Sequence, residues 1–222
     1  MPVVVLASSK GGSTKTTTNL IVGLQLAKKG FSVCYVDADA EEHLSDWAML
    51  PGKPDNVSVV NGVNEDTIID VIAEQNDKFD FVLVDLEGTA SLMVAHAVAM
   101  ADFVVIPCQA SRMDARCAKK TIKMIKNQSR LLKRPIPFAV LFTRTPPPDF
   151  ETKVLKNIRN EMLNANVPMF KRGLQEWAVY RDVLDFGGML EDMDPKKVSN
   201  LPKAIENGDD VVGELVGFMT ED

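Results

Sequence analysis

The chain has 222 residues, of which 45% are hydrophobic and 25% charged, and its formal net charge at pH 7 is -6. This composition is that of a globular protein with a substantial core, so we expect residues 1–222 to form one domain. The negative charge excludes a protein that coats nucleic acid by bulk charge, but it leaves room for a local basic patch. The first residues, MPVVVLASSKGG, do not read as a signal peptide, and no apolar run approaches the roughly 20 residues of a membrane span. We therefore expect a cytoplasmic protein that does not contact membranes.

Apolar runs alternate with helical patterns along the chain. The expected strands are Val3–Ala7, Ser32–Val36, Val57–Val60, Phe81–Asp85, Phe103–Pro107, Phe138–Phe142 and a short Val167–Phe170. The expected helices are Thr16–Lys29, Thr67–Glu74, Leu92–Met100, Ala115–Lys133 and Glu151–Ala165. The strands are apolar without clean alternation, which indicates that helices cover both faces of the sheet. This order predicts the α/β class, with a doubly wound, mainly parallel sheet that binds ligands at the carboxyl ends of its strands.

The three cysteines show neither a CxxC pair nor the spacing of metal ligands. Cys34 and Cys108 lie within apolar runs, where a free, buried thiol is expected. We therefore expect no structural metal or iron–sulfur cluster. The isolated His43 and His96 are interpreted as structural, and Trp47 and Trp177 are expected to pack in the protein.

Residues 8–18, SSKGGSTKTTT, lie between the first expected strand and the first expected helix. In this position backbone N–H groups and the helix N-terminus point toward an anion, which is how phosphate is bound. Lys15 is expected to reach the β- and γ-phosphates and Thr16 to bind Mg²⁺. The strict phosphate-loop pattern places glycine where this chain has Ser9 and Thr14. A second lysine, Lys10, makes the distinctive pattern KGG-x-x-KTT.

Two further strands end in carboxylates. Asp37 and Asp39 follow the second expected strand, and Asp85 ends the fourth, followed by Glu87. The carboxyl ends of parallel strands meet at one edge of a sheet, so these groups are expected near the phosphate loop. Carboxylates there hold metal-bound water and orient an attacking water. The alternative is that each aspartate only caps a strand or the next helix.

Together, SKGGSTKTTTNL, YVDADAEEHLSDW and FVLVDLEGTA resemble the ParA/MinD family of deviant Walker-A ATPases. The resemblance implies nucleotide sandwich dimers that partition plasmids or position cellular cargo. The later stretches LFTRTPPP and EWAVYRDVLDFGGML look like the short plasmid-type branch. That branch includes small ParA proteins and a conjugation-associated protein that acts at transfer-DNA borders.

The resemblance implies a role for each matching residue. Lys10 is the signature lysine that reaches the partner's nucleotide, Lys15 is the Walker lysine, and Asp39 positions the hydrolytic water. The metal ligands are Thr16, Asp37 and Asp85, of which Asp37 supports the metal shell and Asp85 is the Walker-B aspartate. The residues expected to hold ATP or ADP are Gly11, Gly12, Ser13, Thr14, Lys15, Thr16, Thr17, and, at the adenine, Thr143 and Arg144.

Thr14 departs from this family, which has glycine before the Walker lysine. A β-branched residue there loses freedom and adds a side chain near the phosphates. The substitution is compatible with normal binding, weaker binding or slower turnover. We expect binding to survive, because the N–H donors remain, and hydrolysis to be slow. Leu86-Glu87-Gly88 also departs from the Pro-Pro or Gly-Gly that often follows the Walker-B aspartate.

One helical segment is strongly basic. Between residues 112 and 134 there are nine lysines and arginines against one acid, Asp114, and most of these cations recur every three or four residues. Ala118, Ile122, Ile125 and Leu132 form the other face. The alternatives are a solvated helix face and a sequence-independent contact to DNA phosphates. The candidate DNA contacts are Arg116, Lys119, Lys120, Lys123, Lys126 and Arg130.

These observations favour an ATPase switch that dimerises and binds DNA non-specifically in the ATP state. A centromere-binding adaptor protein on DNA would stimulate hydrolysis and reset it, and the protein would associate with the nucleoid. The alternatives are an accessory ATPase of conjugative DNA transfer and a nucleotide-dependent interaction protein without turnover. The acidic Asp209–Asp222 argues against the membrane-positioning branch of the family. A metabolic relative of the same fold would need cluster cysteines or a substrate domain.

Overall fold

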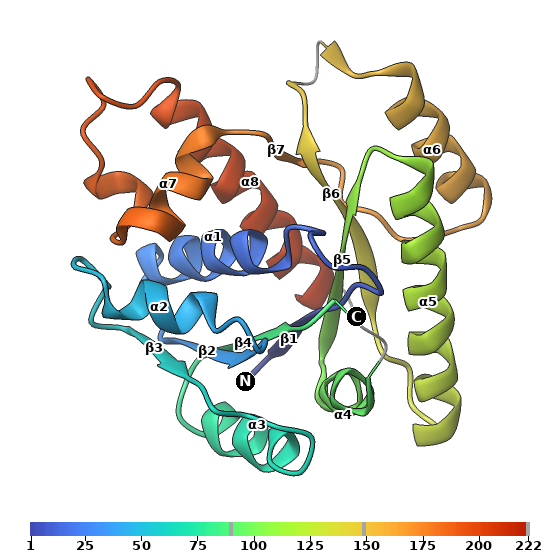
Figure 1. Ribbon diagram of the computed structural model, residues 1–222. Coiled ribbons are helices and arrows are strands. Elements are labelled where there is room, and N and C mark those ends of the chain that lie inside the picture. Colours follow the sequence, from blue (N-terminus) through green and yellow to red (C-terminus); the bar gives the residue numbers. More distant parts are fainter. Residues whose placement is uncertain (89–90, 148–149, 221–222) are drawn as a thin grey trace.

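The computed structural model describes residues 1–88, 91–147 and 150–220. Seven parallel strands form one sheet in the order β3-β2-β4-β1-β5-β6-β7 (Figure 1). Their bounds are β1 (Val3–Leu6), β2 (Val33–Ala38), β3 (Val57–Val60), β4 (Phe81–Leu86), β5 (Phe103–Gln109), β6 (Phe138–Thr145) and β7 (Leu174–Gln175). The predicted fold class, a doubly wound parallel sheet, is confirmed.

Helices cover both faces of this sheet (Figure 1). One layer contains α1 (Lys15–Lys28), α2 (His43–Met49), α7 (Ala178–Phe186), the 3₁₀ turn Leu190–Asp192 and α8 (Leu201–Thr220). The other layer contains α3 (Ile68–Asn76), α4 (Leu92–Met100), α5 (Arg112–Leu132) and α6 (Lys153–Asn164). No helix within the described ranges is long and apolar enough to cross a membrane.

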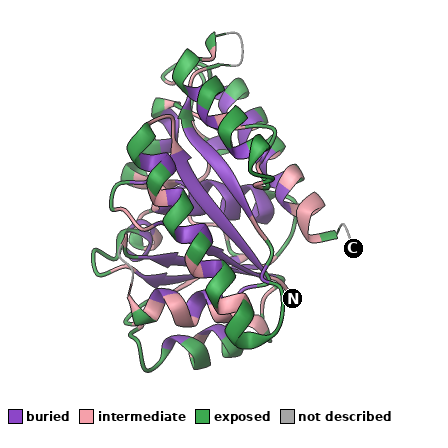
Figure 2. Ribbon diagram, turned by 90° about the vertical axis from the view of Figure 1, so that its right-hand side faces the viewer, coloured by how far each residue is buried: buried purple, intermediate pink, exposed green. Residues whose placement is uncertain are grey.

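The core consists of two apolar clusters, one on each side of the sheet. The central strand β1 sends Val4 and Leu6 into one cluster and Val3 and Val5 into the other. Successive side chains of a strand point to opposite faces, so a strand between two helical layers is apolar throughout. Figure 2 shows these strands buried behind helices whose outer faces are exposed. The apolar strands without alternation therefore have a direct structural cause.

The expected strand at residues 167–170 is wrong. Only Met169 makes an isolated bridge there, to Val140, and the seventh strand is instead Leu174–Gln175. Pro168 has no N–H to donate, so this segment cannot complete a regular ladder. The sequence predictions also missed α2, α7 and α8.

Helix α5 begins three residues before the predicted start. Ser111 caps it, because its Oγ accepts the Asp114 N–H at 3.1 Å. Ala118, Ile122 and Ile125 face the core as predicted, but Leu132 is 42% exposed at the end of the helix. Cys34, Cys108 and Trp47 are buried and the cysteines are free, which confirms those predictions.

Candidate nucleotide site

The phosphate loop lies between two other strand ends because β1 pairs with both β4 and β5. An open cleft of about 610 Å³ is lined by residues 11–17 of the loop. Asp39, Glu41 and His43, which follow β2, and Glu87 and Gly88, which follow β4, line it as well. The structure thus brings together the segments that the motifs had singled out. A cleft at the carboxyl ends of parallel strands is where this fold class binds ligands.

The loop ends in left-handed backbone before α1. Gly12 has φ 69°, and Thr14, the N-cap residue of α1, has φ 65° and makes no side-chain cap. The Thr14 hydroxyl donates to the Ser13 carbonyl instead. A β-branched residue rarely adopts positive φ, so the position at which the family has glycine also has glycine-like backbone here. Lys15 begins α1 and is only 5% exposed.

Asp37 and Asp85 are direct neighbours on the adjacent strands β2 and β4. Both are buried, at 1% and 0% exposure. Asp37 Oδ2 accepts the N–H of Ser45 at 2.8 Å and its hydroxyl at 2.7 Å, in the first turn of α2. Asp37 therefore stabilises the start of this helix, which was the alternative to a metal role. Its Oδ1 has no hydrogen-bond partner in the described part of the chain.

Asp85 has an unusual environment. Neither carboxylate oxygen accepts a hydrogen bond from the residues described. The pKa of Asp85 is raised to about 7, mainly by burial and to a smaller extent by the carboxylates of Asp37 and Asp39. Thr16 and Lys15 act in the opposite direction and lower this pKa. The Thr16 hydroxyl lies close to Asp85 without meeting the geometry of a hydrogen bond.

This environment fits a hard cation. Mg²⁺ is typically held by one or two carboxylates, with the remaining ligands from water and phosphate. A buried carboxylate beside a threonine hydroxyl is such a donor set. The lone pairs of the Asp85 carboxylate that accept no hydrogen bond from the described residues would coordinate the cation. Within the described ranges there is no group of three or more His, Cys, Asp or Glu residues that would hold a metal unaided. The fit therefore depends on a nucleotide supplying the other ligands.

Asp39 lies at the wall of the cleft. Its Oδ1 accepts the N–H of Glu41 at 3.1 Å, and His43 Nε2 lies 3.0 Å from Glu41 Oε2. His43 is exposed and lines the cleft, so its interpretation as a purely structural residue does not describe its position. A single histidine without a spacing pattern carried no signal for this.

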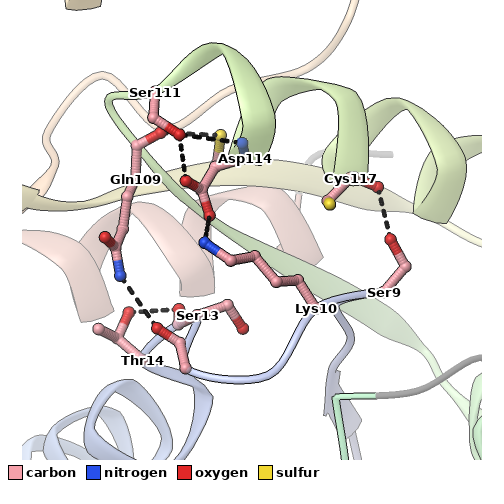
Figure 3. Close-up of polar contacts among 10 residues, drawn as sticks. Ser9, Lys10, Ser13, Thr14, Gln109, Ser111, Asp114 and Cys117 are labelled. Atoms are coloured by element: carbon pink, nitrogen blue, oxygen red, sulfur yellow. Dashed lines mark hydrogen bonds and ion pairs between the residues drawn. The ribbon is translucent and has the colours of Figure 1, made fainter.

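Lys10 points toward α5. Its Nζ forms an ion pair with Asp114 Oδ1 at 3.1 Å, and Gln109 Nε2 at the end of β5 donates to the Gly12 carbonyl at 3.1 Å (Figure 3). Asp114 is 5% exposed and also accepts the hydroxyl of Ser111. Sequence reasoning treated Asp114 only as the single acid of a basic segment. The available signal was the Ser-x-x-Asp spacing, which indicates a helix start with the aspartate in its first turn, beside the capping serine.

The predicted adenine contacts lie beside the cleft. Thr143 is 1% exposed at the end of β6 and its hydroxyl has no partner in the described structure. Arg144 has φ 50° and lines both the cleft and an adjoining pocket of about 30 Å³. Trp177, half-buried, also lines this small pocket, so it lies nearer the candidate base site than expected.

The six candidate DNA contacts all lie on the exposed face of α5. Figure 2 is viewed from the side of α5 and α6 and shows this outer surface as largely exposed. Only Lys119 among the six forms an ion pair with any described residue, at 3.6 Å from Glu161. An exposed pair of this length contributes little. The face therefore carries positive charge that acidic side chains do not neutralise.

Comparison with known proteins gives the family. The model of the VirC1 protein family matches residues 1–204. The chain belongs to the VirC1 family. It is also 34% identical over 221 residues to the protein ParA of Rhizobium radiobacter, covering 100% of this chain and 99% of that one. The resemblance to ParA-like proteins inferred from the motifs is thereby confirmed.

Two solved structures share the fold of this VirC1-family protein. The ATP complex of the D38A variant of McdA from Cyanothece has a TM-score of 0.78 at 18% identity, over 98% of this chain and 96% of that one. A plasmid partition protein from Borrelia burgdorferi, described as putative and bound to AMPPNP, has a TM-score of 0.71 at 14% identity, over 97% and 98%.

Proposed function

We propose that this VirC1-family protein is an ATP-dependent dimerising switch for plasmid or DNA partition. The observation that carries the proposal is the cleft in which a phosphate loop meets Asp39 and the unpartnered, buried Asp85. Two solved proteins of the same fold contain ATP or AMPPNP, and a relative that matches the whole chain is named ParA.

Each residue of the cleft has a role in this proposal. The loop N–H groups and Lys15 hold the phosphates. Thr16 and Asp85 would hold Mg²⁺, and Asp37 would support the metal shell. The bound ion would neutralise charge that develops on the phosphates. The Asp39 carboxylate accepts a hydrogen bond from the attacking water and thereby orients it.

Lys10 is proposed to act across a dimer interface. In the structure its ammonium group is paired with Asp114 at 3.1 Å and its side chain is 30% exposed. Contact with a partner's nucleotide requires this pair to separate, and the phosphates then replace the carboxylate as its counter-charge. In this proposal the Lys10–Asp114 ion pair is present in the monomer and breaks when the dimer forms.

DNA is proposed to bind on the exposed cations of α5. Contacts of this kind are made to phosphates, are independent of sequence, and weaken steeply with salt. A dimer would present two such helices, which would restrict strong binding to the ATP state. The proposed adaptor protein, bound at a centromere, would stimulate hydrolysis and release the DNA. Such a switch would be found on the nucleoid.

Two alternatives follow from particular observations. The stretches LFTRTPPP and EWAVYRDVLDFGGML, which resemble a branch that includes a conjugation-associated protein, favour an accessory role in conjugative DNA transfer. The left-handed Thr14 favours a protein that binds nucleotide without appreciable turnover. Phosphate release measured with and without DNA separates this second alternative from the switch.

The central test is the mass of the protein in solution with ADP and with a non-hydrolysable ATP analogue. We expect a monomer with ADP and a dimer with the analogue, and we expect Lys10→Ala to remain monomeric while it still binds nucleotide. A wild-type protein that binds the analogue and stays monomeric would contradict the switch.

The DNA surface is tested by charge reversal. Replacing Lys119, Lys123 and Lys126 with glutamate should abolish retention of random-sequence DNA in the presence of the ATP analogue. The matched control replaces the exposed Lys196, Lys197 and Lys203, which precede or begin α8, and makes the same change in net charge. Equal loss of DNA binding in both triple variants would show that bulk charge, and not α5, is responsible.

A further inference from the structure

Helix α5 contacts the phosphate loop along one face. Ser9, the residue before the signature lysine, donates its N–H to Thr121 Oγ1 at 3.2 Å and its hydroxyl to the Cys117 carbonyl at 3.1 Å. Lys10 pairs with Asp114 one turn earlier. The contacts at 114, 117 and 121 recur at helical spacing, so one stripe of α5 supports the first half of the loop. Figure 3 shows two of these contacts, Ser9 with Cys117 and Lys10 with Asp114.

The Thr121 side chain is held in an orientation that serves this contact. It is 2% exposed, and its hydroxyl donates to the Cys117 carbonyl at 3.1 Å. Because its proton is committed to that carbonyl, the oxygen presents lone pairs to the Ser9 N–H. The Ser9 N–H is thereby directed at α5, and it is not one of the donors that face the cleft.

The opposite stripe of the same helix carries the exposed cations. Arg116 and Lys120 lie between the loop-contacting positions in sequence, Lys123 follows the last of them, and all three are exposed. A rigid helix of 21 residues thus has the loop on its inner side and unneutralised positive charge on its outer side. A ligand that binds the basic face and shifts α5 would therefore also shift the side chains that contact the loop.

We propose that Thr121 is a positioning residue of the nucleotide site and that α5 couples a polyanion on its basic face to the phosphate loop. The coupling rests on the proposed function, whereas the positioning role rests on the hydrogen bonds alone. Contacts with α5 position Ser9 and Lys10, whereas Lys15 and Thr16 belong to the first turn of α1. A small displacement of α5 relative to α1 therefore changes the width of the loop that holds the phosphates.

The first experiment uses the protein without ligand. Thr121→Val removes the hydroxyl and keeps the branched shape, and Thr121→Ser keeps the hydroxyl. Amide hydrogen exchange at Ser9 should be faster in Thr121→Val by about tenfold, the loss of one hydrogen bond, and close to wild type in Thr121→Ser. Unchanged protection of the Ser9 amide in Thr121→Val would overturn the positioning role.

The second experiment measures coupling. The affinity for a fluorescent ATP analogue is determined with and without a short random-sequence duplex at low salt. We expect the duplex to change the affinity by about fivefold or more in wild type and in Thr121→Ser, and to have little effect in Thr121→Val. An equal ratio in wild type and Thr121→Val, or no change in a wild type that visibly binds the duplex, would overturn the coupling.

The two proposals fail in different ways. A wild-type protein that binds neither nucleotide nor duplex contradicts the proposed function and removes the coupling with it. The exchange of the Ser9 amide still decides the role of Thr121 in that case. Thermal unfolding of both Thr121 variants shows whether a global loss of stability accounts for faster exchange.

Discussion

Thr14 occupies the left-handed region of backbone space, at φ 65°, where glycine has no steric penalty. For a residue with a β-carbon this conformation costs on the order of 1–2 kcal/mol, and β-branching adds to that cost. No hydrogen bond from the Thr14 side chain to a free N–H of α1 compensates for it. Strained residues of this kind persist where the surrounding structure holds them, often at functional sites.

We predict that Thr14→Gly stabilises the ligand-free protein by about 0.5–1 kcal/mol. The gain is smaller than the strain because glycine has more conformational freedom in the unfolded chain. Urea unfolding measures the change, and calorimetric titration should show that ATP affinity does not fall. Thr14→Ala keeps the β-carbon and serves as the control. A variant with glycine that is less stable than wild type would show that Thr14 is not strained.

Asp85 is a second residue that lowers the stability of the folded protein, because its carboxylate is buried without a hydrogen-bond partner among the described residues. Its pKa is raised from 3.8 to about 7, so the native state binds this proton more tightly than the unfolded state. Stability from this group is therefore present in acid and lost as the pH rises through about 7.

Asp85→Asn is accordingly predicted to stabilise the ligand-free protein at about pH 8. The upper bound is on the order of 4 kcal/mol, and the advantage should shrink as the pH falls through 7 toward 4. Thermal unfolding across this range measures it. The same variant should lose any effect of Mg²⁺ on nucleotide affinity, since its amide is a poorer ligand than a carboxylate. An advantage independent of pH would contradict the assignment of the raised pKa to this carboxylate.

Among the elements, the segment after β4 and the phosphate loop are packed with no room between their backbones. A β-carbon built on Gly88 would lie 2.4 Å from Gly11 N and 2.6 Å from the carbonyl carbon of Lys10. Backbone atoms cannot yield as a flexible side chain does. The position of one segment therefore depends on that of the other, through Gly88.

We predict that Gly88→Ala destabilises the protein by about 1–3 kcal/mol, as overpacking does, and weakens nucleotide binding at the displaced loop. The control is Gly213→Ala in α8, where a β-carbon would meet nothing within 4 Å. That change should be neutral or stabilising by about 0.5–1 kcal/mol, because alanine favours helix. Equal behaviour of the two variants in urea unfolding would contradict the packing argument.

The outer face of helix α5 could be predicted from the sequence, whereas its inner contacts could not. Its basic outer face followed from the spacing of lysines and arginines, because a period of three to four residues marks one side of a helix. Its inner contacts with the phosphate loop did not follow, since Ser9 and Thr121 lie 112 residues apart. Residue type at these positions indicates burial at most.

At the scale of the whole molecule, strand order decides the site. Because β1 lies between β4 and β5, the end of the first strand meets segments that begin near residues 86 and 109. Charge is also unevenly distributed, since a chain with a net charge of -6 exposes on α5 the six cations proposed to contact DNA, of which only Lys119 pairs with an acid among the described residues. Both properties belong to the assembled protein and to none of its elements alone.

The sequence by itself determined the class of fold and the position of the loop at residues 8–18 and of the carboxylates at the strand ends, because apolar periodicity and short motifs are local properties of the chain. It also predicted the basic face of α5. Only the tertiary structure decided that Asp37 holds α2, that Asp114 pairs with Lys10, and that Gly88 packs on Gly11. These contacts depend on which strands are neighbours, and strand order is set by packing of the whole sheet rather than by any local pattern.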